Sequence, residues 1–264
     1  MTEILTCSFD PVSADEVKAL RQYRKDHGID ELYVSVTEEG ILAKQIRTEL
    51  LKKALKPYRH LHVISDEGKP FEDSDEEAIR NGRYELAAEG IRKDLITEGY
   101  YLKETVYAMC NPHRAAHSIS VAETCVRLGR AHGMDEKKAW IMGMLHDITK
   151  AFSDEDNRKI IEIYKPEWLS LSPKVWHSYT AVIYAKQHMR LSDPDIMNAM
   201  EHHTLGDGNT DWDHLLYIAD KIEPLRGYDV SVQNAMALKN LKEAAAYIKE
   251  ESRAYIYKTE GIHV

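Results

Sequence analysis

The residues of this chain best suited to chemistry are histidines and aspartates in its second half. The sequence has 13 histidines, more than exposed helices ordinarily need. Six residues lie in order at or near apolar faces of successive predicted helices: His117, His146, Asp147, His177, His203 and Asp220. A buried carboxylate without a partner is costly, and imidazoles and carboxylates that converge from several helices are typical metal ligands. The ordered set therefore predicts a metal site.

The adjacent pair His146-Asp147 ends a predicted helix that begins near Asp135. Neighbours on a helix point about 100° apart, so this pair can approach one cation from two sides or contact two cations. Such a pair arises often by chance, and any one of the six residues alone is more commonly a hydrogen-bonded core or turn residue. The metal interpretation therefore depends on the whole ordered set.

Five residues near these ligands are candidates for contact with an anionic substrate: Lys150, Thr204, Gly206, Glu223 and Arg226. Lys150 lies one turn beyond Asp147 and can meet a phosphate, while Arg226 can form a bidentate phosphate contact. Glu223 can orient a cation. We assign catalytic roles to Asp147, Lys150 and Arg226. The alternative is solvated surface charge for the charged residues and an ordinary helix C-terminus for Thr204 and Gly206.

Two regions with different secondary-structure patterns must position these residues. The first alternates predicted strands (3–9, 31–36, 60–64) with predicted helices (13–27, 41–55). This alternation predicts βαβ units and a small parallel sheet. A polar loop over 66–75 follows, and residues 76–257 have the periodicity of helices. We therefore predict a small α/β domain over residues 1–105 and an all-α domain over residues 106–264.

Composition narrows the class of protein. The formal charge of −9 argues against nucleic acid as the main partner but allows a small phosphorylated ligand. No apolar run approaches the roughly 18 residues of a membrane span, and the N-terminus lacks a signal-peptide pattern. Three widely spaced cysteines fit reduced thiols. We expect a cytoplasmic protein with no nucleic-acid or membrane partner, and a homodimer stays open.

The order of the six residues resembles that of the HD superfamily of metal-dependent phosphohydrolases. Over about residues 112–257, four strings are similar to those of bacterial symmetrical diadenosine-tetraphosphate hydrolases in that superfamily: RxxHS, LHDITK, HTLGD and YIADKIEPLR. The last two discriminate, because many HD proteins have the His-Asp pair but few combine HTxG with ADxIEPxR. The resemblance implies an all-helical HD-type fold for this part of the chain.

The resemblance also implies a di-iron site that cleaves diadenosine tetraphosphate into two ADP. His117, His146, Asp147 and Asp220 would bind one ion, and Asp147 would bridge to a second ion that His177 and His203 complete. From the ligand types alone, iron, manganese, cobalt and zinc stay open. Metals held by such ligands activate water for attack on a phosphoanhydride, so no side-chain nucleophile is required.

The start of the chain resembles the nucleotidyltransferase fold of nicotinate-mononucleotide adenylyltransferases. Residues 7–12 (CSFDPV) are similar to the start of that family's loop, G-x-FDP-x-H-x-GH, but Ser13 and Glu16 stand where its histidines would be. Its second motif, ISSTxIR, falls near residues 75–80, where acidic residues replace the serine and threonine donors. The resemblance implies a degenerate, non-catalytic domain, retained for stability, assembly or ligand binding. Fusions of these two domain types occur in bacteria.

Two other functions stay open. The chain could be an HD phosphohydrolase that acts on another nucleotide, such as a nucleoside monophosphate or a cyclic nucleotide. It could also be a non-catalytic regulator that binds nucleotides with both domains inactive. The complete set of six candidate ligands argues against the regulator, because a decayed site is expected to lack at least one of them.

Overall fold

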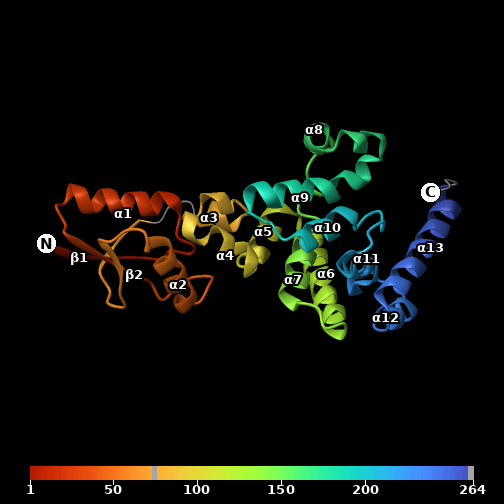
Figure 1. Ribbon diagram of the computed structural model, residues 1–264, viewed down its shortest axis with the longest axis horizontal. Helices are drawn as coiled ribbons and strands as arrows, with labels where there is room; N and C mark the ends of the chain where they lie inside the picture. The colour runs from red at the N-terminus through yellow and green to blue at the C-terminus, as the bar shows by residue number, and fades with distance from the viewer. Residues whose placement is uncertain (73–75, 261–264) are drawn as a thin grey trace. The chain divides into compact units, whose positions relative to one another are not determined.

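The computed structural model describes residues 1–72 and 76–260, and the chain divides into two compact units (Figure 1). The first comprises Met1–Tyr101 with Gln187–Arg190, and the second comprises Leu102–Lys186 with Leu191–Val264. A parallel α/β unit followed by an all-helical unit confirms the fold class that the sequence predicts. Among the described residues, no helix combines the length and apolar character that crossing a membrane would require.

A four-stranded parallel sheet with the strand order β3-β2-β1-β4 forms the core of the first unit. The strands are β1 (Thr2–Cys7), β2 (Glu31–Val36), β3 (Leu61–Val63) and β4 (Lys69–Pro70), and the longer helices are α1 (Ala14–Asp26) and α2 (Lys44–Leu55). β1 and β2 pair over their whole length, from Thr2 opposite Glu31 to Cys7 opposite Val36. Buried Leu5, Leu32 and Val34 are typical of strands covered on both faces.

One strand lies where the sequence predicts only loop. β4 falls inside residues 66–75 and pairs with Leu5 and Thr6 of β1. It is two residues long and contains Pro70, which sheets tolerate at an edge because no neighbour needs its missing N–H. So short a segment carries no periodic signal, which is why the loop prediction was wrong here. Residues 73–75 of the predicted loop lie outside the described residues.

Side chains of the first unit fill the place where such sheets usually bind ligands. The connections reverse direction between β1 and β4, and ligands ordinarily bind beyond the carboxyl ends of strands at such a reversal. There the buried Glu76, which begins α3 (Glu76–Arg80), accepts hydrogen bonds from Ser8 Oγ at 2.6 Å and from the Asp10 amide at 2.7 Å. Its other oxygen lies 3.2 Å from Arg80. The Glu76 carboxylate thus occupies the position where an anionic ligand of such a sheet would bind.

The N–H groups at the start of α1 are likewise hydrogen-bonded within the chain. The Glu16 amide donates to Ser13 Oγ at 2.9 Å, and the Ser13 amide donates to Glu16 Oε2 at 2.6 Å, which completes a capping box. Cys7, Glu16 and Glu76 bring possible metal-binding atoms within 4.8 Å of one another. Both carboxylates, however, already accept hydrogen bonds from the protein, including one from Cys7 Sγ at 3.6 Å. We therefore interpret this cluster as an internal hydrogen-bond network.

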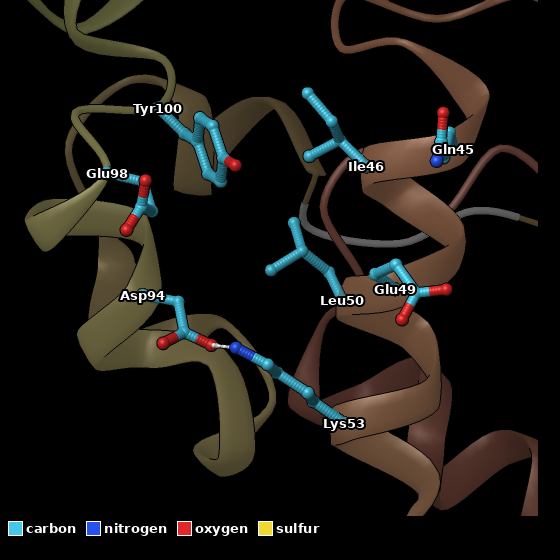
Figure 2. Close-up of a pocket in the computed structure, with 8 residues that line it drawn as sticks. All are labelled: Gln45, Ile46, Glu49, Leu50, Lys53, Asp94, Glu98 and Tyr100. Carbon is cyan, nitrogen blue, oxygen red and sulfur yellow. Dashed lines mark hydrogen bonds and ion pairs between the residues drawn. The ribbon is translucent and has the colours of Figure 1, made fainter.

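A pocket between α2 and α4 (Arg92–Thr97) is acidic and ill suited to phosphate (Figure 2). Ile46 and Leu50 point toward Tyr100 across the pocket, and Lys53 pairs with Asp94 at 2.7 Å. Two further carboxylates, from Glu49 and Glu98, line the same pocket. Because its lysine is already paired with a carboxylate, this pocket offers a phosphorylated ligand no unpaired cation.

Nine helices of the described chain build the second unit. They are α5 (Leu102–Met109), α6 (Pro112–Ala131), α7 (Glu136–Leu145), α8 (Asp154–Tyr164), α9 (Trp176–His188), α10 (Pro194–His202), α11 (Asp211–Ile222), α12 (Ser231–Ala237) and α13 (Leu241–Glu260). Local signals begin several of them, because Asn111, Asp135 and Asp193 each cap a helix through a side-chain oxygen. Helices α6, α7, α9, α10 and α11 carry or precede the candidate ligands.

Small residues bring α6 and α7 close together. A Cβ atom added to Gly143 of α7 would lie 2.4 Å from the Cα atom of Ala122 in α6, which is closer than real Cβ contacts. The absence of a side chain at Gly143 therefore allows the two helices to approach. This contact places the end of α7, with the His146-Asp147 pair, beside His117 on α6.

We predict that Glu76→Ala destabilises the first unit by about 2–3 kcal/mol, because it leaves the Asp10 amide and the Arg80 guanidinium without their buried partner. Exposed Glu77→Ala, on the same helix, is the matched control and should change little. All four tryptophans (Trp140, Trp168, Trp176 and Trp212) belong to the second unit. Denaturation followed by circular dichroism should therefore shift, while the tryptophan-fluorescence transition should not. An unchanged circular dichroism transition would contradict the prediction.

Candidate metal centre

The structure brings the six candidate ligands together in two groups that share Asp147. Possible metal-binding atoms of His117, His146 and Asp147 form the first group, and those of Asp147, His177 and His203 form the second, each within 4.8 Å. Asp220 of α11 joins the first group, because its Oδ1 lies 3.2 Å from His117 Nε2 and 4.0 Å from His146 Nε2. All six residues are at most 6% exposed.

The two oxygens of Asp147 face different groups. Oδ1 lies 3.0 Å from His177 Nε2 and 3.6 Å from His203 Nε2. Oδ2 lies 3.7 Å from His146 Nε2 and 3.9 Å from His117 Nε2. A carboxylate with one oxygen toward each histidine pair has the arrangement that a bridge between two cations needs.

Three of the four histidines are held at Nδ1 by oxygen atoms of the chain. The Nδ1 atoms of His146 and His203 each lie 2.7 Å from a carbonyl oxygen three residues earlier, those of Gly143 and Met200. Nδ1 of His117 lies 3.1 Å from a carboxylate oxygen of Glu223. Nε2 of His117 also lies 3.2 Å from a carboxylate oxygen of Asp220; burial lowers the pKa of His117, but Asp220 and Glu223 outweigh burial and raise it. Because the two carbonyl oxygens only accept, Nδ1 of His146 and of His203 carries the hydrogen and Nε2 keeps its lone pair. This is the tautomer that a metal ligand requires.

His177 is held differently, by Lys150. The Lys150 ammonium lies 2.9 Å from His177 Nδ1 and 3.0 Å from the Lys174 carbonyl oxygen. An ammonium only donates, so Nδ1 of His177 accepts in this arrangement and its Nε2 hydrogen faces Asp147. Binding of a cation by Nε2 would therefore require Lys150 to move from this contact. Lys150, for which the sequence predicts a phosphate contact, thus directly touches a candidate ligand.

Two buried nitrogens test whether the site suits a cation. Nε2 of His117 and Nε2 of His146 are buried and make no hydrogen bond within the described structure. Burial lowers the pKa of His146 to about 3, so its imidazole is neutral near pH 7. Uncompensated buried nitrogen atoms are costly, and a neutral imidazole is the form that binds metal. The donor set therefore fits divalent cations of the kind that His/Asp sites bind.

The aspartates are held in the charged form. Burial by itself would raise the pKa of Asp147, but His146, His177 and His203 outweigh it and hold that pKa well below its usual range. Burial likewise opposes ionisation of Asp220, and Lys221 and His117 are the main groups that keep its pKa well below the usual range. Both carboxylates are consequently anionic near pH 7 and able to bind cations.

Cationic side chains surround the two carboxylates. Arg114 Nη1 lies 2.7 Å from Oδ2 of Asp147. Arg226 Nη2 lies 2.6 Å and Lys221 Nζ 2.8 Å from oxygens of Asp220. Burial chiefly lowers the pKa of Lys150, and the positive charges of Arg114 and Lys221 lower it further. Three of these cations contact the aspartates directly, and Lys150 contacts His177 beside them.

The structure gives Glu223 a different set of contacts from the substrate contact that the sequence predicts. It is 2% exposed and supports Nδ1 of His117, and its second oxygen accepts a hydrogen bond from the Leu225 amide at 2.7 Å, which caps the short helix η5 (Pro224–Arg226). Glu223 thereby orients a candidate ligand from behind. Its side chain is buried, and a substrate contact for Glu223 stays a prediction.

Thr204 and Gly206 lie just beyond α10, with contacts inside the fold. Thr204 donates to Ser178 Oγ at 3.3 Å. Gly206 has a φ of 59°, and a Cβ there would lie 2.6 Å from the Tyr217 ring, so glycine is needed for both conformation and packing. A substrate contact for these two residues stays a prediction.

Two of the surrounding cations, Arg114 and Lys221, have no role that the sequence predicts. Arg114 precedes His117 by three residues on α6, a spacing that puts both on one helix face. Lys221 directly follows Asp220. The first spacing is a usable signal, whereas adjacency on a helix gives no reason to expect Lys221 to turn back toward its neighbour's carboxylate.

Comparison with known proteins agrees with this geometry. The family model of the HD domain matches residues 114–225. A symmetrical bis(5'-nucleosyl)-tetraphosphatase of Bacillus subtilis is 33% identical over 119 residues, which cover 44% of this chain and 64% of that protein. A probable nicotinate-nucleotide adenylyltransferase/Ap4A hydrolase of Mycoplasma genitalium is 28% identical over 189 residues, which cover 66% of this chain and 52% of that protein.

A solved structure is similar as well. It is that of a predicted HD superfamily hydrolase involved in NAD metabolism from Clostridium acetobutylicum, with a TM-score of 0.56 and 26% identity over 61% of this chain and 88% of that one. The chain thus spans a little under two thirds of the first curated relative and about half of the second. Its helical unit contains an HD domain, distantly related to symmetrical tetraphosphatases.

Proposed function

We propose that this chain cleaves diadenosine tetraphosphate symmetrically into two ADP. The observation that carries the proposal is the pair of buried histidine groups sharing Asp147, with four cationic side chains around them. The tetraphosphatase of Bacillus subtilis and the fusion protein of Mycoplasma genitalium support it through their named activities.

Divalent cations in this site would supply an activated water and neutralise charge that develops on phosphoryl oxygens. We assign one cation to His117, His146, Asp147 and Asp220, and a second to Asp147, His177 and His203. Iron is our proposal for the native metal, although manganese suits the same ligands. The residues of the chain hold these ligands in place, above all Glu223 behind His117 and the two carbonyl oxygens behind His146 and His203.

The balance of charge favours a substrate with several phosphates. Arg114, Lys150, Lys221 and Arg226 oppose the carboxylates of Asp147, Asp220 and Glu223. Divalent cations would make this region strongly positive, although the whole chain has a formal charge of −9. A positive site in a negative protein attracts a compact polyanion without attracting nucleic acid in general. A tetraphosphate bridge matches this distribution better than a single phosphate does.

Lys150 and Arg226 are the residues that we propose to contact the transferred phosphates. Lys150 is partly exposed, and a phosphate oxygen can replace the Lys174 carbonyl oxygen as acceptor for its ammonium. Arg226 uses Nε and Nη2 on Asp220 and is 36% exposed, so its remaining N–H groups can face a substrate. Both residues would stabilise charge and orient the phosphate chain.

The first unit, in this proposal, is a nucleotidyltransferase-like domain without catalytic activity. Glu16 accepts a hydrogen bond from the Ser13 amide at the N-terminus of α1, and Glu76 accepts one from the loop amide of Asp10. A phosphate in this position would use the same donors. The acidic pocket beside α2 offers no replacement for those donors. The role that we propose for the first unit is in stability, assembly or ligand binding.

The first experiment is an assay of the manganese- or iron-loaded protein with diadenosine tetraphosphate. We expect ADP as the sole product, resolved by chromatography. AMP together with ATP would keep a hydrolase but reject symmetrical cleavage. An absence of turnover would reject the proposed substrate and direct the search to other nucleotides or to a binding regulator.

Asp147→Ala is expected to lose both metal ions and all turnover, because the two groups share this carboxylate. Metal content would be measured by mass spectrometry after reconstitution and dialysis. Asp154→Ala, an exposed aspartate in the same unit, is the control and should retain both properties. Equal metal content in the wild type and Asp147→Ala would rule out a bridging role.

The chain with both units is expected to form no dinucleotide from ATP and nicotinate mononucleotide, because its own carboxylates occupy the phosphate position of the first unit. The Asp147→Ala variant should be assayed in parallel, so that the helical unit cannot consume a product. Dinucleotide formation in either protein would disprove the assignment of a non-catalytic first unit.

A further inference from the structure

We propose that Arg114 is a substrate-binding residue, whose guanidinium holds Asp147 with one edge and a phosphate of the substrate with another. The inference rests on the proposed function, and it adds a contact on the α6 side of the site. Arg226 and Lys221 already flank Asp220 on the α11 side. A polyphosphate would then meet cations at both aspartates.

Arg114 is partly exposed to solvent and contacts a buried residue of the site. Its Nη1 lies 2.7 Å from Oδ2 of Asp147, whose side chain is 5% exposed, while the side chain of Arg114 is 33% exposed. The Arg114 amide donates to the capping oxygen of Asn111 at 2.9 Å, which fixes the backbone of this residue in the first turn of α6. The backbone of Arg114 is thus held by Asn111 and its guanidinium by Asp147, and the side chain is still partly open to solvent.

The remaining donors of Arg114 are what make it a binding residue. A guanidinium has five N–H donors, and within the described structure Arg114 uses its side chain only on Asp147. Arg47 in the first unit shows the opposite case. It is fully buried, and its donors contact the carbonyl oxygens of Ser8, Thr37, Glu38 and Leu42. Arg47 is therefore structural, whereas Arg114 keeps donors for a planar, bidentate phosphate contact.

A purely orienting role for Arg114 would need neither exposure nor spare donors. A single hydrogen bond to Asp147 could come from a smaller, buried side chain. The charge of Arg114 also reaches Lys150, which lies at the other histidine group. Arg114 at Asp147, Lys150 at His177 and Arg226 at Asp220 thus each place a cation beside a candidate ligand.

The test uses the manganese-loaded chain with both units, and inorganic pyrophosphate as the probe, titrated by calorimetry. We expect Arg114→Gln to weaken pyrophosphate binding about ten- to hundredfold, the usual effect of losing a charge-assisted contact, while manganese content stays at the wild-type level. Arg114→Lys should recover part of the affinity, because it restores the charge without the bidentate geometry. Arg127→Gln, an exposed arginine on the same helix, removes the same charge and should bind like wild type.

Two results would overturn the proposal. One is a loss of manganese in Arg114→Gln with unchanged pyrophosphate affinity in the protein that remains loaded, which would leave Arg114 only a positioning role at Asp147. The other is a wild-type protein that fails to bind pyrophosphate when loaded. Turnover of diadenosine tetraphosphate is measured separately, so failure of the proposed reaction does not affect this binding test.

Discussion

Burial of the Asp147 carboxylate is the constraint on which the helical unit depends. Nitrogens of His117, His146, His177 and His203 all lie within 4 Å of its oxygens. A charge so deeply buried is tolerated only where partners compensate it. Those partners come from α6, α7, α9 and α10, and α11 adds Asp220 beside them. The helices are therefore arranged around a charge as much as around an apolar core.

The two units of the chain treat buried carboxylates in opposite ways. In the first unit, Glu16 and Glu76 accept hydrogen bonds from nearby N–H, O–H and S–H groups, which leaves little capacity for a ligand. In the second, Asp147 and Asp220 face imidazoles and flexible cationic side chains. These partners can be exchanged for a metal or a phosphate. Buried carboxylates are thus occupied by hydrogen bonds in the first unit, whereas in the second unit they lie where a metal could replace their partners.

Much of the architecture is readable from local patterns. Alternating apolar residues indicate β1 and β2, helical periodicity and capping residues indicate the long helices, and strand patterns end before residue 76, where the succession of helices begins. β4 escapes this reasoning because two residues at an edge carry no period and depend on pairing with Leu5 and Thr6. Its existence is a consequence of the sheet and not of its own sequence.

The sequence by itself determined which six residues could bind metal, because residue type and order along successive helices are properties of the chain. The tautomers of His146 and His203 follow from the structure, where carbonyl oxygens three residues earlier accept from Nδ1 of each. Only the tertiary structure decided that Glu223 supports His117 across 106 residues, that Lys150 touches His177, and that Arg114 reaches Asp147. Those contacts join separate helices, and their distances follow from packing, which no local pattern encodes.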